Sequence, residues 1–206
     1  MSPIPTQQRN MTELTITAPS KSLVSLYPKI EQITGGEIID IHALMEVQKS
    51  PHWSEKINHI RALSDKKAIE KAKKTLPYFT GSGTFSTRNN DGLIQHSGKL
   101  IIDFDKLVDE SGDTQALDSA IFQLKSDKYT EYLYRSCSGR GLAVVVSIDP
   151  NKHLESFLYL ENYYQDNYRL TIDKSCKDVS RPRYISYDPD LFHNPEAEFV
   201  LLKATT

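Results

Sequence analysis

Two aspartates spaced two residues apart form the pair whose chemistry stands out. Asp103 and Asp105 follow the apolar run KLII, which is typical of a strand. Residues i and i+2 of a strand point to the same face, so both carboxylates are expected side by side while Phe104 turns into the core. Two close carboxylates repel unless a cation lies between them, and such oxygen ligands suit Mg²⁺ or Mn²⁺. A strand that ends in polar residues at a loop has the same pattern, so both interpretations stay open.

A Gly/Ser-rich segment, SCSGRG, separates two predicted strands at Tyr129–Arg135 and Gly141–Ile148. Its glycines allow positive φ, and its amides, hydroxyls and arginine are groups that can hold phosphate oxygens. An ordinary hairpin turn has the same composition, so this segment alone does not decide between the two. The candidate nucleotide-binding residues here are Ser136, Ser138, Gly139, Arg140 and Gly141.

A third carboxylate follows later in the chain. Asp173 ends RLTID, which is predicted as a short strand at Arg169–Asp173 and could add a third metal ligand. A basic string comes next, in which Arg181 and Arg183 are further nucleotide-binding candidates. A carboxylate beside several arginines is what a site for a metal and a nucleoside triphosphate needs. A salt-bridged surface turn looks the same.

The segment from Lys49 to Lys74 is locally basic, with eight Lys/Arg against three Asp/Glu. Helix-forming residues predict a helix over 65–75, capped by Ser64 or Asp65. This face could contact nucleic acid, although a solvated helix face is equally compatible with the composition. The nucleic-acid-binding candidates are Lys66, Lys67, Lys73, Lys74 and Arg88. Among the histidines, His96 is the best placed for a role in the site, because it precedes the Asp103 strand.

The composition bounds the class of protein. The 206 residues carry a net charge of −2 and are 38% hydrophobic, which excludes wholesale disorder and a collagen-like fibre. Two cysteines cannot build a disulfide scaffold, and no run of about 18 apolar residues is present to span a membrane. The first ten residues lack an apolar secretory core, so a cytoplasmic protein without a membrane partner is expected. The GxxxxGK[ST] motif of phosphate-loop ATPases is absent.

Strands and helices interleave along the chain. A strand is expected within 11–18, and a further one at Arg183–Tyr187. Helices are expected at 37–48, around Trp53, and at 65–75, 113–126 and 151–167. This order excludes a helical bundle and an all-β sandwich and favours an α+β fold with a mostly antiparallel sheet.

Taken in order, LIIDFD, SCSGRGL, LTID and SRPRYISYDPD resemble the motifs of primase–polymerases of the archaeo-eukaryotic primase superfamily. The stretch LPYFTGSGTFSTRNNDGLIQHSGKLIIDFDKL is more closely similar to the VirE N-terminal primase-like domain family of mobile elements and phages. The resemblance covers residues 20–195. It implies an RNA-recognition-motif-like (RRM-like) sheet packed against an N-terminal α/β unit. The chain then divides into a flexible tail at 1–10, the N-terminal unit at 11–98 and a catalytic core at 99–206.

The resemblance also implies an activity. The protein would be a metal-dependent nucleotidyltransferase, a DNA primase or primase–polymerase that makes or extends primers in the DNA replication of a mobile element or phage. Asp103, Asp105 and Asp173 would bind two divalent cations, Mg²⁺ or Mn²⁺, while Arg181 and Arg183 face phosphates or template. Its partners would be nucleoside triphosphates, a single-stranded DNA template and a separate replicative helicase.

One departure from the family pattern favours an alternative. In many primase–polymerases the Gly/Ser motif includes a histidine that contacts the nucleotide phosphates, whereas this chain has Leu142-Ala143 there. The alternative is a catalytically inactive primase-like module that binds single-stranded nucleic acid or a helicase. A metal-dependent nuclease is a third hypothesis, because paired aspartates also serve phosphodiester hydrolysis.

Overall fold

The computed structural model describes residues 21–202; the expected tail at 1–10 and strand within 11–18 lie outside this range. The strands are β1 (Leu23–Tyr27), β2 (Glu37–Asp40), β3 (Tyr78–Thr80), β4 (Gly83–Phe85), β5 (Leu93–His96), β6 (Lys99–Phe104), β7 (Tyr132–Arg135), β8 (Leu142–Ser147), β9 (Pro182–Tyr184) and β10 (Phe192–His193). The α-helices are α1 (Ile41–Lys49), α2 (Ser54–Ala62), α3 (Lys66–Lys73), α4 (Gln115–Lys125) and α5 (His153–Tyr168). Short 3₁₀ helices are η1 (Pro51–Trp53), η2 (Asn90–Gly92), η3 (Pro150–Lys152) and η4 (Lys174–Lys177).

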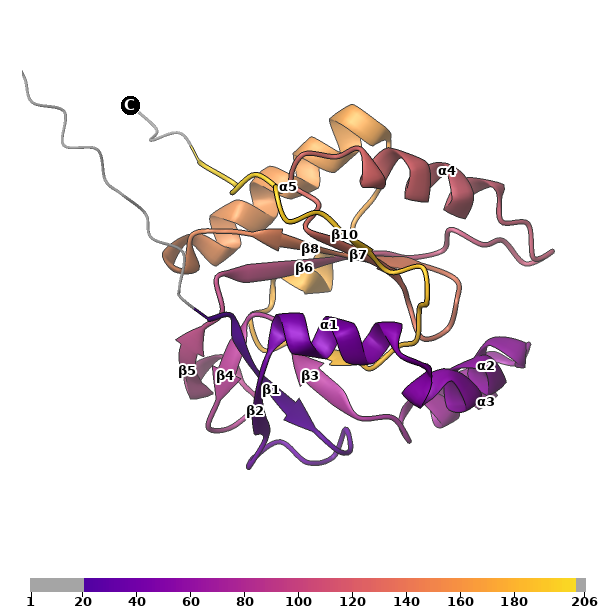
Figure 1. The fold of residues 1–206 in the computed structure, drawn as a ribbon, viewed down its shortest axis with the longest axis horizontal. Helices are drawn as coiled ribbons and strands as arrows, with labels where there is room; N and C mark the ends of the chain where they lie inside the picture. The colour runs from indigo at the N-terminus through magenta and orange to yellow at the C-terminus, as the bar shows by residue number, and fades with distance from the viewer. Residues whose placement is uncertain (1–20, 203–206) are drawn as a thin grey trace, which may run out of the picture.

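The central layer is a four-stranded antiparallel sheet in the order β10-β7-β8-β6. Helices α4 and α5 lie on one face of this sheet and α1 lies on the other (Figure 1). The alternation of β6 matches this arrangement, because Leu100, Ile102 and Phe104 pack with α4 and α5. Ile101 packs on the opposite side with α1. Asp103 follows Ile101 by two residues and therefore belongs to the α1 side of the sheet.

A second antiparallel sheet has the order β2-β1-β3-β9. Three of its strands come from the first 80 residues, whereas β9 arrives from the C-terminal part of the chain and pairs Arg183 with Phe79. The N-terminal sheet is therefore completed by the segment that follows Asp173. The short β4–β5 pair forms a third, two-stranded sheet.

The predicted α+β class with antiparallel sheets is confirmed. From β6 onward, the strands and α-helices follow the order β6-α4-β7-β8-α5-β9-β10. Because β9 joins the N-terminal sheet, the central sheet and its helices keep the β-α-β-β-α-β order expected of an RRM-like core. The last strand, β10, pairs with β7 and not with β6, so the fourth strand lies at the opposite edge from its place in an RRM. The boundary at 98/99 between an N-terminal unit and a core stays a prediction.

Several local predictions are confirmed and others are wrong. Helix α3 begins where predicted, because the Asp65 carboxylate accepts the Ala68 N–H at 2.8 Å. The prediction of one helix at 37–48 is wrong in its first part: these residues form β2, which pairs with β1. Helix α1 begins only after Asp40, which caps it. Arg169–Asp173 is not a strand: Arg169 ends α5 in the left-handed conformation, at φ 59°. The segment Arg183–Tyr187 is extended only over β9.

No helix within residues 21–202 combines the length and the apolar character that crossing a bilayer requires.

The strand alternation generates a stability prediction. Phe104 is fully buried against Tyr164 of α5, whereas Phe122 on α4 is 77% exposed. We expect Phe104→Ala to lower the free energy of unfolding by about 3–5 kcal/mol, because it removes packed ring atoms and leaves a cavity. Phe122→Ala should stay within about 0.5 kcal/mol of wild type. Urea unfolding of both variants measures this, and equal losses would contradict the assigned faces of β6.

Candidate functional site

The end of β6 opens into a cleft of about 300 Å³ at the junction of the two sheets. Three segments that are distant in the sequence form its walls: the end of β6, the turn between β7 and β8, and the segment that leads into β9. Helix α3 adds one lysine at the edge. The residues that line it are Lys73, Asp103, Asp105, Tyr134, Ser136, Cys137, Ser138, Leu142, Ala143, Arg181, Pro182, Arg183, Tyr184 and Ser186.

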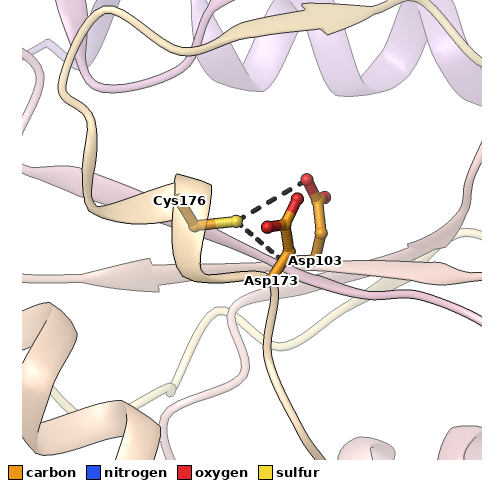
Figure 2. Close-up of side chains that lie close together, drawn as sticks. All are labelled: Asp103, Asp173 and Cys176. Atoms are coloured by element: carbon orange, nitrogen blue, oxygen red, sulfur yellow. Dashed lines mark hydrogen bonds between the residues drawn. The ribbon is translucent and has the colours of Figure 1, made fainter.

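Backbone pairing brings Asp173 next to Asp103. The Asp173 N–H donates to the Asp103 carbonyl at 2.9 Å. The Asp173 side chain then accepts the Ser175 N–H at 2.9 Å and caps η4. Figure 2 shows the two carboxylates beside Cys176, whose thiol lies 3.6 Å from Asp103 Oδ2. One ligand atom from each of these three side chains lies within 4.8 Å of the others.

Arg183 is buried beneath this cluster, with only 8% of its side chain exposed. One terminal nitrogen donates to Asp103 Oδ1, and the other donates to the Ile101 carbonyl and to the Cys176 sulfur. Burial disfavours the guanidinium charge, but the Asp103 carboxylate outweighs it, and the pKa of Arg183 is raised above its usual value. One oxygen of Asp103 therefore accepts from the buried Arg183 guanidinium, while its second oxygen faces Cys176 and Arg181.

Arg181 occupies a more exposed position above the same carboxylates. Its terminal Nη2 lies 2.6 Å from Asp173 Oδ2 and 3.9 Å from Asp103 Oδ2, and 32% of its side chain is exposed. Partial burial opposes ionisation of Asp173, but the Ser175 hydrogen bonds and the Arg181 charge outweigh it and lower the pKa of Asp173. Asp173 is therefore ionised at neutral pH.

Asp105 stands at the rim of the cleft, one residue beyond β6. Within residues 21–202 it has no basic side chain within 4.0 Å, unlike Asp103 and Asp173. Partial desolvation, followed by the charges of Asp103 and Asp173, raises the pKa of Asp105. Two like charges beside an acid disfavour its ionised form, and a bound cation would remove that penalty.

The Gly/Ser turn approaches the end of β6 closely. A Cβ on Gly141 would lie 2.5 Å from the Phe104 carbonyl, so only glycine allows this contact. Gly139 adopts φ +74°, and Ser136 and Ser138 place their hydroxyls 3.2 Å apart on the cleft wall. Arg140 is exposed and does not line the cleft. The predicted turn residues thus divide into two that line the cleft and three that shape or flank it.

The predicted nucleic-acid-binding residues do not all gather at the cleft. Lys73 reaches its edge and pairs with Glu70 at 3.1 Å. Lys66, Lys67 and Lys74 line the outer face of α3. Arg88 does not line the cleft: it donates to the Tyr78 hydroxyl at 3.0 Å and stacks over that ring.

His96 does not line the cleft either. It lies 3.0 Å from His153 through the ring nitrogens, and burial together with His153 lowers the pKa of His96 to about 4.

Tyr134, Tyr184 and Ser186 line the cleft and were not singled out from the sequence. Two residues that support the cleft from outside its lining, Cys176 and Arg61, were not anticipated either. Cys176 contacts Asp103, and its distance of three residues from Asp173 was the available signal, because side chains at i and i+3 eclipse in a 3₁₀ helix. Arg61 of α2 donates to the Ser136 carbonyl at 3.1 Å and to the Tyr187 carbonyl at 2.8 Å, and so holds the turn from outside. No local pattern around Arg61 indicates these partners, which lie at least 75 residues away.

Two of the three predicted carboxylates, Asp103 and Asp105, line the cleft, whereas Asp173 lies beside Asp103 outside the lining. Fold and site together define an α+β protein whose acidic cleft is flanked by a Gly/Ser turn and by basic side chains. Residues 71–193 match the family described as BT4734-like, N-terminal domain, and the chain belongs to this family. The matched range contains every residue that lines the cleft. No curated protein and no solved structure matches the chain.

The buried ion pair generates a stability prediction. We expect Arg183→Met to destabilise the fold by about 3–5 kcal/mol, because it leaves Asp103 and the Ile101 carbonyl without their partner. Arg140→Met makes the same change on the exposed turn and should stay within about 0.5 kcal/mol of wild type. Chemical denaturation of both variants gives the comparison. Similar midpoints would show that the Arg183 pair does not hold the sheets together.

Asp105 generates a prediction about pH. Its pKa is raised in the folded state, so the folded protein binds this proton more tightly than the unfolded chain. Stability is therefore lost as the pH rises through that folded pKa, and Asp105→Asn should raise the urea midpoint at pH 7. The gain should vanish below the unfolded pKa of about 3.9. The same gain at pH 3 and at pH 7 would contradict an electrostatic origin.

Proposed function

We propose that this protein is a divalent-metal-dependent nucleotidyltransferase, a DNA primase or primase–polymerase. It would make or extend primers on single-stranded DNA during replication of a mobile element or phage. The observation that carries the proposal is a cleft lined by Asp103, Asp105, Ser136 and Ser138, with Asp173 hydrogen-bonded to Asp103 beside it. Asp173 reaches this position from 68 residues beyond Asp105, so the three acids meet only in the folded chain.

The donor atoms fit hard divalent cations. Asp105 has no ion pair within the described residues, Asp173 is ionised, and Asp103 keeps one oxygen clear of Arg183. Carboxylate oxygens are the ligands that Mg²⁺ and Mn²⁺ prefer. Two such cations, when bound, activate an attacking 3′-hydroxyl and stabilise the departing pyrophosphate.

The remaining side chains suit the phosphates of a nucleoside triphosphate. The Ser136 and Ser138 hydroxyls face the cleft and can donate to phosphate oxygens. Arg181 and Lys73 bring positive charge to the same wall, whereas Arg183 is committed to Asp103 beneath it. Arg181 would therefore contact the phosphates of the substrate, whereas Arg183 would hold Asp103, a metal ligand, in position.

A single-stranded template would approach along α3. Lys73 marks the edge of the cleft, and Lys66, Lys67 and Lys74 continue the positive charge along that helix. Such contacts with the phosphate backbone give affinity that falls as salt rises. A replicative helicase would be a separate partner.

One observation favours the alternative of a catalytically inactive binding module. Leu142 and Ala143 line the cleft at the place where many primase–polymerases carry a histidine, and Ala143 pairs directly with Asp103 across β6 and β8. It offers no polar atom to a phosphate, so Arg181, Ser136 or Ser138 would have to supply that contact. The alternative expects salt-sensitive binding of single strands without incorporation of nucleotides.

The activity is tested by nucleotide incorporation on a single-stranded template with Mg²⁺ or Mn²⁺. Asp105→Asn is the sharpest variant because, unlike Asp103→Ala, it leaves the buried Arg183 pair intact. We expect a loss of about 100-fold or more, since even outer contacts of metal sites contribute about 10–100-fold. Asp166→Asn, on the exposed face of α5, makes the same chemical change and should keep full activity.

Two results would contradict the proposal. Well-folded wild-type protein that binds single strands but incorporates nothing would favour the binding module. Degradation of DNA in the absence of nucleotide would indicate a nuclease.

A further inference from the structure

The two arginines of the cleft make different kinds of contact with the carboxylates. Arg183 has three acceptors from two elements: the Asp103 carboxylate and the Ile101 carbonyl on β6, and Cys176 on η4. Its side chain is 8% exposed. If the Arg183 side chain moved away, the buried Ile101 carbonyl would lose its hydrogen bond and the Asp103 carboxylate its ion pair, so this arginine is fixed in place.

Arg181 is held much less firmly. Within residues 21–202, its only side-chain hydrogen bond is with Asp173, at 2.6 Å, and its Nε has no partner. About a third of its side chain is exposed, so moving the guanidinium into solvent costs less than moving that of Arg183. The segment that carries it hydrogen-bonds locally, since the Arg181 N–H donates to the Asp178 carbonyl. The side chain can therefore rotate without disturbing β9.

The position of Arg181 coincides with that of a bridging cation. Its Nη2 is near one oxygen of Asp173 and one oxygen of Asp103, at 2.6 Å and 3.9 Å. Figure 2 shows these two carboxylates side by side. A divalent ion that joined the same two oxygens would lie against the guanidinium, and like charges at such a separation repel strongly. The guanidinium and the cation therefore compete for one place.

We propose that Arg181 is an internal counter-ion that blocks the metal site until a polyphosphate draws it away. When a nucleoside triphosphate enters, the guanidinium exchanges the Asp173 carboxylate for phosphate oxygens, to which it can donate through two parallel N–H groups. The two carboxylate oxygens then become free for the cation. This inference rests on the proposed function, because it specifies how the same cleft takes up metal and nucleotide.

The consequence is cooperative binding. Metal bound at Asp103 and Asp173 displaces Arg181 and leaves it available to the nucleotide, and nucleotide bound by Arg181 exposes the metal ligands. By thermodynamic linkage, each ligand must raise the affinity for the other by the same factor, and such factors are usually about 5- to 150-fold. In the absence of nucleotide, the site would have a weakened affinity for metal.

The test measures binding directly. The dissociation constant for Mn²⁺ alone is determined for the full chain from the electron paramagnetic resonance signal of free Mn²⁺. We expect Arg181→Gln to bind Mn²⁺ about tenfold more tightly than wild type, because the competing cation is gone. Arg181→Lys keeps the charge and should stay near wild type.

Lys177→Gln removes one positive charge from η4, close to the site in the sequence, without touching the carboxylates, and controls for general electrostatics. Its Mn²⁺ affinity should change less than twofold. Circular dichroism checks that each variant is folded.

A second measurement addresses the coupling. The affinity for a fluorescent ATP analogue is measured without metal and with saturating Mn²⁺. Wild type should show the larger enhancement by metal. Arg181→Gln should show a smaller one, because only direct metal–phosphate contact remains.

The outcomes separate this inference from the proposed function. Equal Mn²⁺ affinity in Arg181→Gln and wild type, with binding lost in Asp105→Asn, would overturn the counter-ion role and leave the metal site standing. No Mn²⁺ binding by any variant would overturn both. Tighter binding in Arg181→Gln from a protein that incorporates no nucleotide would support the counter-ion role and reject polymerase activity.

Discussion

The ion pair between Arg183 and Asp103 is the constraint on which the rest of the structure depends. Arg183 belongs to β9, the edge strand of the N-terminal sheet, and reaches across to β6 of the central sheet. A buried guanidinium must keep its charge partner and its hydrogen-bond acceptors, so this contact fixes the distance between the two sheets. It also orients Asp103, the Ile101 carbonyl and Cys176 around one point. The cleft opens where the sheets meet, and Arg183 is one of the residues that line it.

The fold holds the three carboxylates at the site in different ways. One oxygen of Asp103 accepts a hydrogen bond from the buried Arg183, and the other lies on the side of Arg181. Asp173 is ionised through its cap on η4 and its pair with Arg181. Asp105 has no such support and carries a raised pKa, which means that its ionised form costs stability. A group that the fold holds at a cost is typical of a binding site, where a ligand relieves the cost. Of the three, Asp105 is the one whose position the fold does not explain.

The sequence indicated the parts of the site that depend on local periodicity. Alternation on β6 placed Phe104 in the core and both aspartates on the other side, and Asp65 was a readable cap. The partners of those aspartates were not predictable, because Arg183, Arg181 and Cys176 reach Asp103 only through pairings between segments more than 70 residues apart. The wrong strand at 169–173 has a local cause. Its alternating residues are typical of a strand, but Arg169 turns left-handed and Asp173 pairs by its backbone with Asp103.

The charges around the cleft indicate that the fold does not need the proposed metal. Asp103 is paired with Arg183 and Asp173 with Arg181, so the charges of these two carboxylates are balanced without any ion. A structural metal site, in contrast, leaves its ligands unfolded or mutually repelling until the ion arrives. Adding divalent cations to these balanced pairs makes the site positive. Such a cleft would attract a polyphosphate anion more strongly with metal than without it, which agrees with the cooperative binding proposed for Arg181.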